Sequence, residues 1–137
     1  MFNPDSLLLP FFEDSHRQLH DDLHKWSAQQ FTNRVHQGNV DQTCVDLTRT
    51  LGKAGWLRFC VPAQYGGALP ALDSRSLCLI RQTLSYYDGL ADFAFVMAGL
   101  GSGPISLFGS DHLKEKYLPK VATGELIAAF ALSEPDA

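Results

Sequence analysis

Apolar residues recur near the start of the chain with the spacing of an amphipathic helix. Four of them follow one another at intervals of seven, four and three residues: Phe12, Leu19, Leu23 and Trp26. Pro10 suits the first turn of this helix, because the N–H that proline lacks would have no helical partner there. The next residues, 33–39, are polar and include a glycine. The pattern therefore predicts a helix from Pro10 to about Phe31 or Thr32, followed by a loop.

Several later apolar stretches are preceded by short polar side chains that can cap a helix. Such side chains accept hydrogen bonds from the first N–H groups of the helix, which have no partner within it. The candidate caps are Asp41, Asp73 or Ser74, Asp88 and Ser110. Between the helices that Asp41 and Asp73 begin, residues 56–62 are apolar but short and end in proline, so we expect an extended connector there. Pro119 begins a last helical turn, which Gly124 ends.

The stretch from Gly89 to Leu100 predicts a helix that is apolar on nearly all sides. Such a helix is normally buried all round, and five short helices cannot easily surround one of their own number. We therefore expect Phe93, Phe95 and Val96 to lack cover within this chain, so that more protein from the same chain or another subunit must provide it. An acidic residue, glycines and a proline interrupt the apolar window 90–108, which favours a buried helix over a membrane span.

A second apolar run, from Leu126 to Leu132, lies at the end of the chain. Its length and the turn residues around it indicate a buried strand. A strand needs hydrogen-bonding partners, and no other stretch of the chain has a comparable pattern. We therefore expect a helical domain over residues 1–124 and the first strand of a truncated β domain over residues 125–137.

The composition is typical of a globular intracellular protein. Of the 137 residues, 45% are hydrophobic and 19% are charged, which suits one packed domain. The net charge of −4 provides no basic surface for nucleic acid. The three cysteines, Cys44, Cys60 and Cys78, lack metal-binding spacing and are expected to be reduced and buried. The N-terminus lacks the basic region of a leader peptide. We therefore expect a cytoplasmic protein that binds neither nucleic acid nor membrane.

Three histidines, His16, His20 and His24, recur at every fourth position of the first predicted helix. This spacing places the imidazoles on one face, where they could bind a metal ion. His16 and His24 would, however, lie about 12 Å apart along the helix axis, which is too far for all three to reach one ion easily. The histidines also lie largely away from the apolar face, so we expect a solvent-exposed face and no metal site.

A glycine at every second position from Gly99 to Gly103 could indicate a phosphate-binding loop. Loops of that kind follow a strand and precede a Lys-Ser/Thr pair, and this sequence has neither feature. We therefore expect the glycines to allow close helix packing or to break the helix before Pro104.

Four segments in the second half of the chain resemble motifs of the acyl-CoA dehydrogenase family, in the same order. They are 61–67 (Val-Pro-Ala-Gln-Tyr-Gly-Gly), 103–109 (Gly-Pro-Ile-Ser-Leu-Phe-Gly), 114–125 (Lys-Glu-Lys-Tyr-Leu-Pro, then Gly-Glu) and 130–137 (Phe-Ala-Leu-Ser-Glu-Pro-Asp-Ala). In the family the last motif leads into Gly-Ser-Asp, directly after the point at which this sequence ends. The resemblance implies an all-α fold, an orthogonal bundle of about five to six helices like the family's N-terminal domain, with one terminal strand of an incomplete β domain.

The resemblance implies an FAD-dependent enzyme that catalyses α,β-dehydrogenation of acyl-CoA thioesters. In this family the terminal strand lies against the flavin ring, so Phe130 takes an aromatic position, Leu132 a backbone contact and Ser133 a hydroxyl contact. Phe130 stands where tyrosine is commoner, so only packing is expected from its ring. The family's catalytic glutamate belongs to a C-terminal helical domain outside these residues, and we assign that role to neither Glu125 nor Glu134. These residues alone are therefore not expected to be active.

The resemblance also implies an acyl-CoA substrate, a flavoprotein that accepts the electrons, a role in fatty acid metabolism and a homodimer or homotetramer. Ser133 and Glu134 do not form a nucleophile and base by themselves, because neighbouring strand residues point to opposite faces. Two alternatives stay open: a flavin-dependent monooxygenase or oxidase of the same fold, and a non-catalytic helical interaction module. Bound flavin distinguishes the module from the enzymes.

Overall fold

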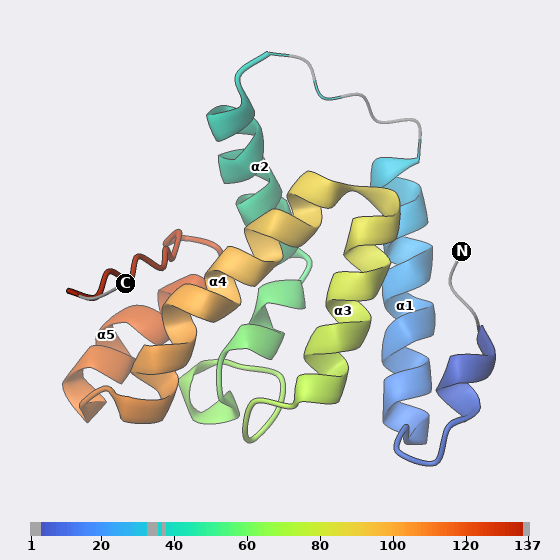
Figure 1. Ribbon diagram of the computed structural model, residues 1–137, viewed down its shortest axis with the longest axis horizontal. Coiled ribbons are helices and arrows are strands. Elements are labelled where there is room, and N and C mark those ends of the chain that lie inside the picture. Colours follow the sequence, from blue (N-terminus) through green and yellow to red (C-terminus); the bar gives the residue numbers. More distant parts are fainter. Residues whose placement is uncertain (1–3, 33–35, 37, 136–137) are drawn as a thin grey trace.

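The chain folds into five α-helices in a computed structural model that describes residues 4–32, 36 and 38–135 (Figure 1). The α-helices are α1 (Asp14–Phe31), α2 (Val40–Lys53), α3 (Ser74–Tyr87), α4 (Gly89–Phe108) and α5 (Asp111–Ala122). Three 3₁₀ helices also occur within these described residues: η1 (Pro4–Leu8), η2 (Trp56–Cys60) and η3 (Ala63–Tyr65). The described part forms no sheet beyond an isolated bridge between Pro62 and Leu69. The expected all-α architecture is confirmed.

Helix α4 is the central element of the bundle. It crosses the molecule diagonally and packs on α2, α3, α5 and η2, while α1 packs along α3 (Figure 1). Phe95 of α4 is fully buried among side chains from the other elements: Leu23, Leu47, Leu57, Ile80, Leu84 and Leu118. Full burial of an apolar side chain of this size stabilises the fold by roughly 1.5–3 kcal/mol. The shared core therefore fixes the other helices relative to α4.

Three helices begin at the predicted caps. Asp73, Asp88 and Ser110 accept hydrogen bonds from N–H groups in the first turn of α3, α4 and α5. Helix α2 is capped by Asn39, whose Oδ1 accepts from two N–H groups of the first turn, so that Asp41 lies inside the helix. Asparagine caps a helix as well as aspartate does, and the local sequence therefore did not decide between the two positions.

Helix α1 begins at Asp14 and not at the predicted Pro10. Glu13 occupies the N-cap position, and its N–H donates to Nδ1 of His16 at 3.1 Å. The guanidinium of Arg17 donates to the carbonyl of Phe12 at 2.9 Å. The side chains of His16 and Arg17 thus hydrogen-bond the backbone directly before the helix and fix where it begins. Pro10 lies in the turn before it.

Residues 56–60 form the 3₁₀ helix η2 and not the predicted extended connector. Gly55 precedes it with a φ of 85°, a left-handed conformation that glycine adopts readily. Leu57 and Cys60 are both buried. Three residues per turn place them on the same face, whereas an extended chain would point them to opposite sides. Burial of both side chains therefore favours the helical turn.

Pro104 does not break α4, which contradicts one of the two roles predicted for the nearby glycines. The N–H that proline lacks would have bonded to the carbonyl of Leu100. Leu100 is 48% exposed, so water can replace that donor. The other predicted role was close helix packing, but the close contact of Gly101 is with the irregular terminal segment: a Cβ there would lie 2.7 Å from the Cβ of Ala128.

Helix α4 is not buried on every side. Phe95 is covered by the core, which contradicts our expectation, whereas Phe93 is 52% exposed, Leu107 is 63% exposed and Val96 is half-buried. Phe93, Leu100 and Leu107 follow one another at intervals of seven and form an outer stripe along one face. By length and composition α4 could also cross a membrane, but its opposite face packs against three helices of this domain.

The terminal segment, residues 126–135, forms no strand. It runs on from α5 without regular secondary structure as far as Pro135. A strand requires a neighbouring chain for its N–H and C=O groups, and the described residues supply none. The described residues therefore contain no strand, and the expected first strand of a β domain and the domain boundary near Gly124 stay predictions.

Candidate functional site

The terminal segment lies against α4 and α2 and borders an apolar cavity. Ala128 is half-buried and packs on the core. The adjacent cavity has a volume of about 290 Å³ and includes in its lining Cys44, Val45, Phe93, Ala94, Met97 and Ile127. Its walls come from three parts of the chain that are distant in sequence, and its apolar lining suits a hydrocarbon group.

The three predicted flavin contacts follow directly after this packed region. Phe130, Leu132 and Ser133 are exposed. The N–H of Leu126 donates to the carbonyl of Lys120 at 3.1 Å, but beyond it the described part of the segment makes no backbone hydrogen bond. These backbone groups and the exposed Ser133 hydroxyl form a donor and acceptor set that suits the polar edge of a planar ligand. The assignment of these residues to flavin contact remains a prediction.

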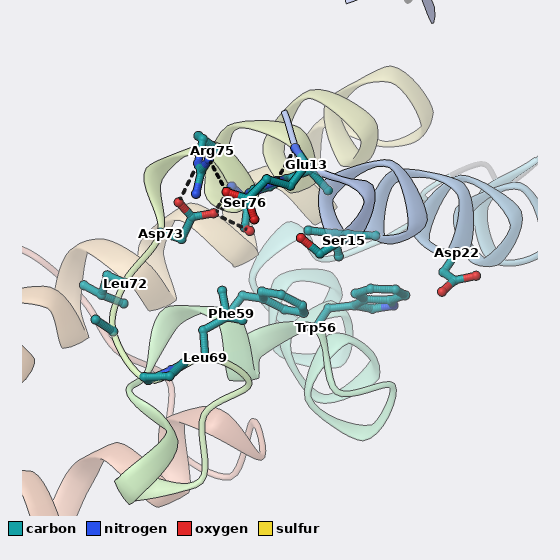
Figure 2. Close-up of a pocket in the computed structure, with 14 residues that line it drawn as sticks. Glu13, Ser15, Asp22, Trp56, Phe59, Leu69, Leu72, Asp73, Arg75 and Ser76 are labelled. Atoms are coloured by element: carbon teal, nitrogen blue, oxygen red, sulfur yellow. Dashed lines mark hydrogen bonds and ion pairs between the residues drawn. The ribbon is translucent and has the colours of Figure 1, made fainter. Parts of the chain in front are cut away.

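A second candidate is a surface groove of about 590 Å³ between α1, η2 and the start of α3. Figure 2 shows the rings of Trp56 and Phe59 along its floor, with Asp73, Arg75 and Ser76 gathered at one end. The two rings are stacked, with centroids 6.4 Å apart. The sequence pattern did not identify this groove, because its floor and its polar end come from segments that only the fold brings together.

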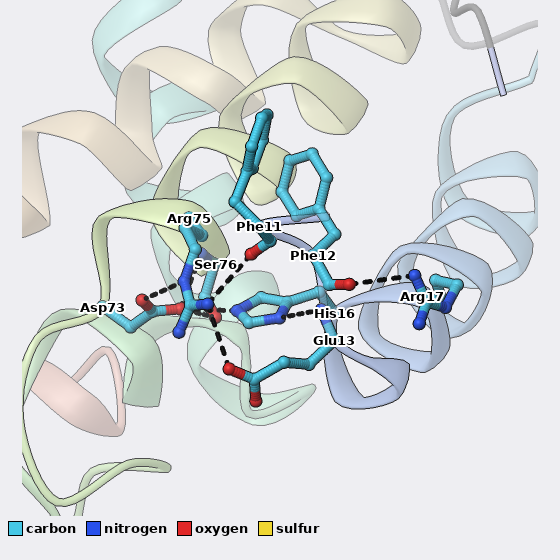
Figure 3. A network of polar contacts seen from close by, with 8 residues as sticks. All are labelled: Phe11, Phe12, Glu13, His16, Arg17, Asp73, Arg75 and Ser76. Atoms are coloured by element: carbon cyan, nitrogen blue, oxygen red, sulfur yellow. Dashed lines mark hydrogen bonds and ion pairs between the residues drawn. The ribbon is translucent and has the colours of Figure 1, made fainter. Parts of the chain in front are cut away.

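A hydrogen-bond network joins the first turn of α1 to the cap of α3 at the polar end of the groove (Figure 3). Nδ1 of His16 accepts the Glu13 N–H, so we assign the ring proton to Nε2, which donates to Oδ2 of Asp73 at 2.9 Å. Ser76 donates to the same carboxylate through its N–H and its hydroxyl. Arg75 donates to Asp73, to Glu13 and to the carbonyl of Phe11.

The network changes the pKa of its charged groups. Burial alone would raise the pKa of Asp73, but hydrogen bonds from Ser76, His16 and Arg75 outweigh burial and hold that pKa well below its usual range. Hydrogen bonds to Asp73 and Glu13 raise the pKa of Arg75. Because His16 and Asp73 use their polar atoms within the network, neither side chain has the free donor or acceptor of a general acid or base. The network is therefore a structural connection between α1 and α3.

Two of the three histidines of α1 are buried, contrary to our prediction of a solvent-exposed face, whereas His24 is exposed as predicted. His16 is 4% exposed and His20 is 9% exposed, because α3 packs along this side of α1. Each histidine has a different hydrogen-bond partner: Asp73 for His16, Asp21 for His20 and Tyr87 for His24. In the part of the chain that the structure describes, no three His, Cys, Asp or Glu side chains are placed to hold one metal ion.

The buried cysteine, Cys60, is not an activated thiol. All three cysteines are free, and Cys60 is buried as expected. Cys44 is only half-buried, and Cys78 is exposed, contrary to our expectation. Burial raises the pKa of the Cys60 thiol to about 12, so the thiolate needed for nucleophilic attack is disfavoured.

Comparisons with known proteins agree with the motifs in the sequence. A family model, "Acyl-CoA dehydrogenase, N-terminal domain", matches residues 13–125. A probable acyl-CoA dehydrogenase of Bacillus subtilis is 43% identical over 91 residues, which cover 66% of this chain and 15% of the relative. The mitochondrial isovaleryl-CoA dehydrogenase of Bos taurus is 33% identical over 104 residues, 75% of this chain and 24% of the relative.

A solved structure shows the same likeness in three dimensions. The crystal structure of an acyl-CoA dehydrogenase complexed with FAD from Bacillus anthracis has a TM-score of 0.71 and 33% sequence identity. The match covers 99% of this chain and 22% of that chain. The chain thus spans between 15% and 33% of the length of the curated relatives named above and of the Mycobacterium tuberculosis FadE12 protein. Since the family model matches most of the chain, this chain belongs to the acyl-CoA dehydrogenase family and contains that family's N-terminal domain.

Proposed function

We propose that the protein containing this domain is an FAD-dependent acyl-CoA dehydrogenase that introduces an α,β double bond into an acyl-CoA thioester. The observation that carries this proposal is the family match over residues 13–125, followed by the flavin-motif resemblance at residues 130–137. The acyl-CoA dehydrogenase names of the relatives and the FAD in the Bacillus anthracis enzyme support it.

The terminal segment is proposed to hold the polar edge of the flavin. Its backbone N–H and C=O groups and the Ser133 hydroxyl are the available donors and acceptors, and Phe130 supplies an apolar ring beside them. Hydrogen bonds to the ring adjust how strongly a flavin attracts electrons, which is the usual contribution of protein to cofactor chemistry. FAD held there would supply a hydride acceptor for the hydrogen on the substrate β-carbon, and a carboxylate base would be needed for the α-proton.

The domain is also proposed to contact the hydrocarbon part of the substrate. The apolar cavity beside Ile127 and the outer stripe of α4 both involve Phe93. Because this apolar region adjoins the proposed flavin segment, an acyl chain lying on it would have its reactive carbons near the flavin. Transfer of such a chain from water to an apolar surface is favourable by about 0.8 kcal/mol per buried CH₂ group.

The proposed partners follow from the family. They are an acyl-CoA substrate of fatty acid metabolism, a flavoprotein that receives the electrons, and further subunits in a homodimer or homotetramer. A cytoplasmic location belongs to the same proposal. The exposed apolar residues of α4 and η1 support additional protein contacts, since large apolar patches on a protein often mark interaction surfaces.

The test is to purify the natural gene product, determine its intact mass and record its visible absorbance before and after anaerobic addition of acyl-CoA thioesters. We expect a yellow protein whose flavin absorbance is lost on reduction by an acyl-CoA. A bound flavin that no acyl-CoA reduces would favour the monooxygenase or oxidase alternative. A colourless protein that does not bind added FAD would favour an interaction module.

A further inference from the structure

Gly101 of α4 is in unusually close contact with the terminal segment. A Cβ built on Gly101 would lie 2.7 Å from the Cβ of Ala128, 2.8 Å from the Ala129 nitrogen and 2.9 Å from the Ala129 oxygen. Two of these three atoms belong to the backbone and cannot rotate away as a flexible side chain can. Any residue other than glycine at position 101 would therefore require the helix or the segment to move.

The neighbouring glycines do not share this constraint. A Cβ on Gly103 would meet no atom within 4 Å, and a Cβ on Gly99 would meet only Sγ of Cys60, at an ordinary contact distance of 3.6 Å. All three glycines lie within two turns of the same helix. Only Gly101 is needed as glycine for the contact with the segment, and Gly103 provides a matched control.

Helix α4 cannot easily retreat at this point. Ser102, which follows Gly101, is fully buried and donates a hydrogen bond to the carbonyl of Cys60 at 3.2 Å. Phe95, two turns earlier in α4, is fixed in the core. A side chain at position 101 would therefore displace the terminal segment and leave the helix in place.

The segment has two points of attachment before the proposed flavin contacts. The first is the turn at Gly124, where the N–H groups of Glu125 and Leu126 donate to the carbonyl of Lys120. The second is the contact of Ala128 and Ala129 with Gly101. Phe130 follows immediately, so a displacement at Ala129 moves it directly.

We propose that Gly101 is a positioning residue, which seats residues 128–129 against α4 and thereby sets the position of Phe130, Leu132 and Ser133 at the flavin. This inference rests on the proposed function. The contact of residues 128–129 with Gly101 must fix the segment within narrow limits, because a hydrogen bond to a flavin needs a donor–acceptor distance of about 2.7–3.2 Å. A shift of the segment by about 1 Å would break such bonds without altering any residue that contacts the flavin.

The test compares Gly101→Ala with Gly103→Ala in the natural gene product. FAD affinity is measured by titration into the apoprotein, together with the visible spectrum of the bound flavin and the Tm of the apoprotein. We expect Gly101→Ala to weaken FAD binding by about tenfold or more and to shift the flavin spectrum, while Gly103→Ala matches the wild type. The Tm of both variants should stay at or above the wild-type value, because alanine favours a helix more than glycine does.

Two results would overturn the inference in distinguishable ways. Wild-type affinity and spectrum in Gly101→Ala would refute the positioning role and leave the proposed function intact. Failure of the wild type itself to bind FAD would refute the proposed function and the inference together.

A large loss of Tm in Gly101→Ala is resolved by a second variant. Gly101→Ala combined with Ala128→Gly removes the closest of the three contacts. Recovery of Tm and of part of the FAD affinity would support the role of Gly101 in positioning residues 128–129. If neither recovered, the Gly101→Ala change would act on the stability of α4 and not on its contact with residues 128–129, and the inference would be overturned.

Discussion

Nε2 of His16 lies 2.9 Å from Oδ2 of Asp73 and joins the first turn of α1 to the cap of α3 across 57 residues of sequence. The same carboxylate caps α3 and accepts the hydroxyl hydrogen of Ser76. The Asp73 side chain thus caps α3 and also accepts a hydrogen bond from the first turn of α1. The packing of α1 on α3 therefore depends on this side chain.

Replacing Asp73 with alanine should lower the free energy of unfolding by about 2–4 kcal/mol. The loss of a helix cap costs about 1 kcal/mol, and a buried ring N–H left without an acceptor costs about 1–3 kcal/mol. Urea unfolding followed by circular dichroism measures the change. Asp111→Ala is the matched control, because Asp111 is an exposed carboxylate in the first turn of α5. Equal losses in the two variants would show that the network contributes nothing beyond a surface charge.

Stability should depend on pH through Asp73. Its pKa is lower in the folded protein than in the unfolded chain, so its contribution is fully present above the unfolded value of about 3.9. The contribution is lost as the pH falls below that value toward the folded pKa. The difference in unfolding free energy between the wild type and Asp73→Asn should therefore be constant near neutral pH and shrink below about pH 4. A difference that grows on acidification would contradict the hydrogen-bond assignment.

The three cysteines should differ in reactivity toward iodoacetamide. Cys78 is exposed and should be alkylated in the native protein, whereas burial raises the pKa of the Cys60 thiol to about 12 and should protect it. Mass spectrometry of peptides after timed labelling measures both rates. Labelling in urea is the control, since unfolding should make Cys60 react as fast as Cys78. Native labelling of Cys60 at the rate of Cys78 would disprove its burial.

Gly52→Ala should destabilise the contact between α2 and the turn after α5. A Cβ at this position would lie 2.2 Å from the carbonyl oxygen of Thr123 and 2.7 Å from the nitrogen of Gly124. Forced overlap of this kind typically lowers stability by about 1–3 kcal/mol. Gly103→Ala, which meets no atom within 4 Å, should be neutral or stabilising by up to about 1 kcal/mol. A neutral result for Gly52→Ala in urea unfolding would mean that the close approach does not exist in solution.

The outer stripe of α4 should make the 137-residue chain on its own bind a hydrophobic dye or self-associate. Phe93, Leu100 and Leu107 present exposed apolar side chains along one face. Replacing Leu100 and Leu107 with glutamine should reduce dye fluorescence and shift the chain toward monomer in sedimentation. Val40→Gln, an exposed apolar site on α2, should change neither. A wild-type chain that is monomeric and does not bind the dye would contradict the need for additional cover.

The helix caps show which parts of the fold are local. Asp73, Asp88 and Ser110 begin their helices as predicted, because a cap bonds to N–H groups two or three residues away. The start of α2 differs from its prediction, since Asn39 offered an equivalent cap before Asp41. The family motifs were also recognisable from short stretches, and the family match over residues 13–125 agrees with them.

Other predictions failed because they depended on what lies against a residue. His16 has the spacing of a surface histidine, but α3 covers it. Phe93 and Phe95 are two positions apart in an apolar helix, and only the packing of the neighbouring helices determines that Phe95 is buried while Phe93 is exposed. The described residues supply no partner for the expected terminal strand, so that strand is not tested by the packing within them.

The presence of the five α-helices, most of their caps and the family could be predicted from the sequence, because these depend on residue types within a few positions of one another. The packing of the helices, in contrast, determines that His16 bonds to Asp73 and that Gly101 is the one of the three alternating glycines that must be glycine. Both contacts join residues from distant parts of the chain. Their distances are set by how the helices pack around Phe95 of α4, and the local pattern of apolar and polar residues carries no information about those distances.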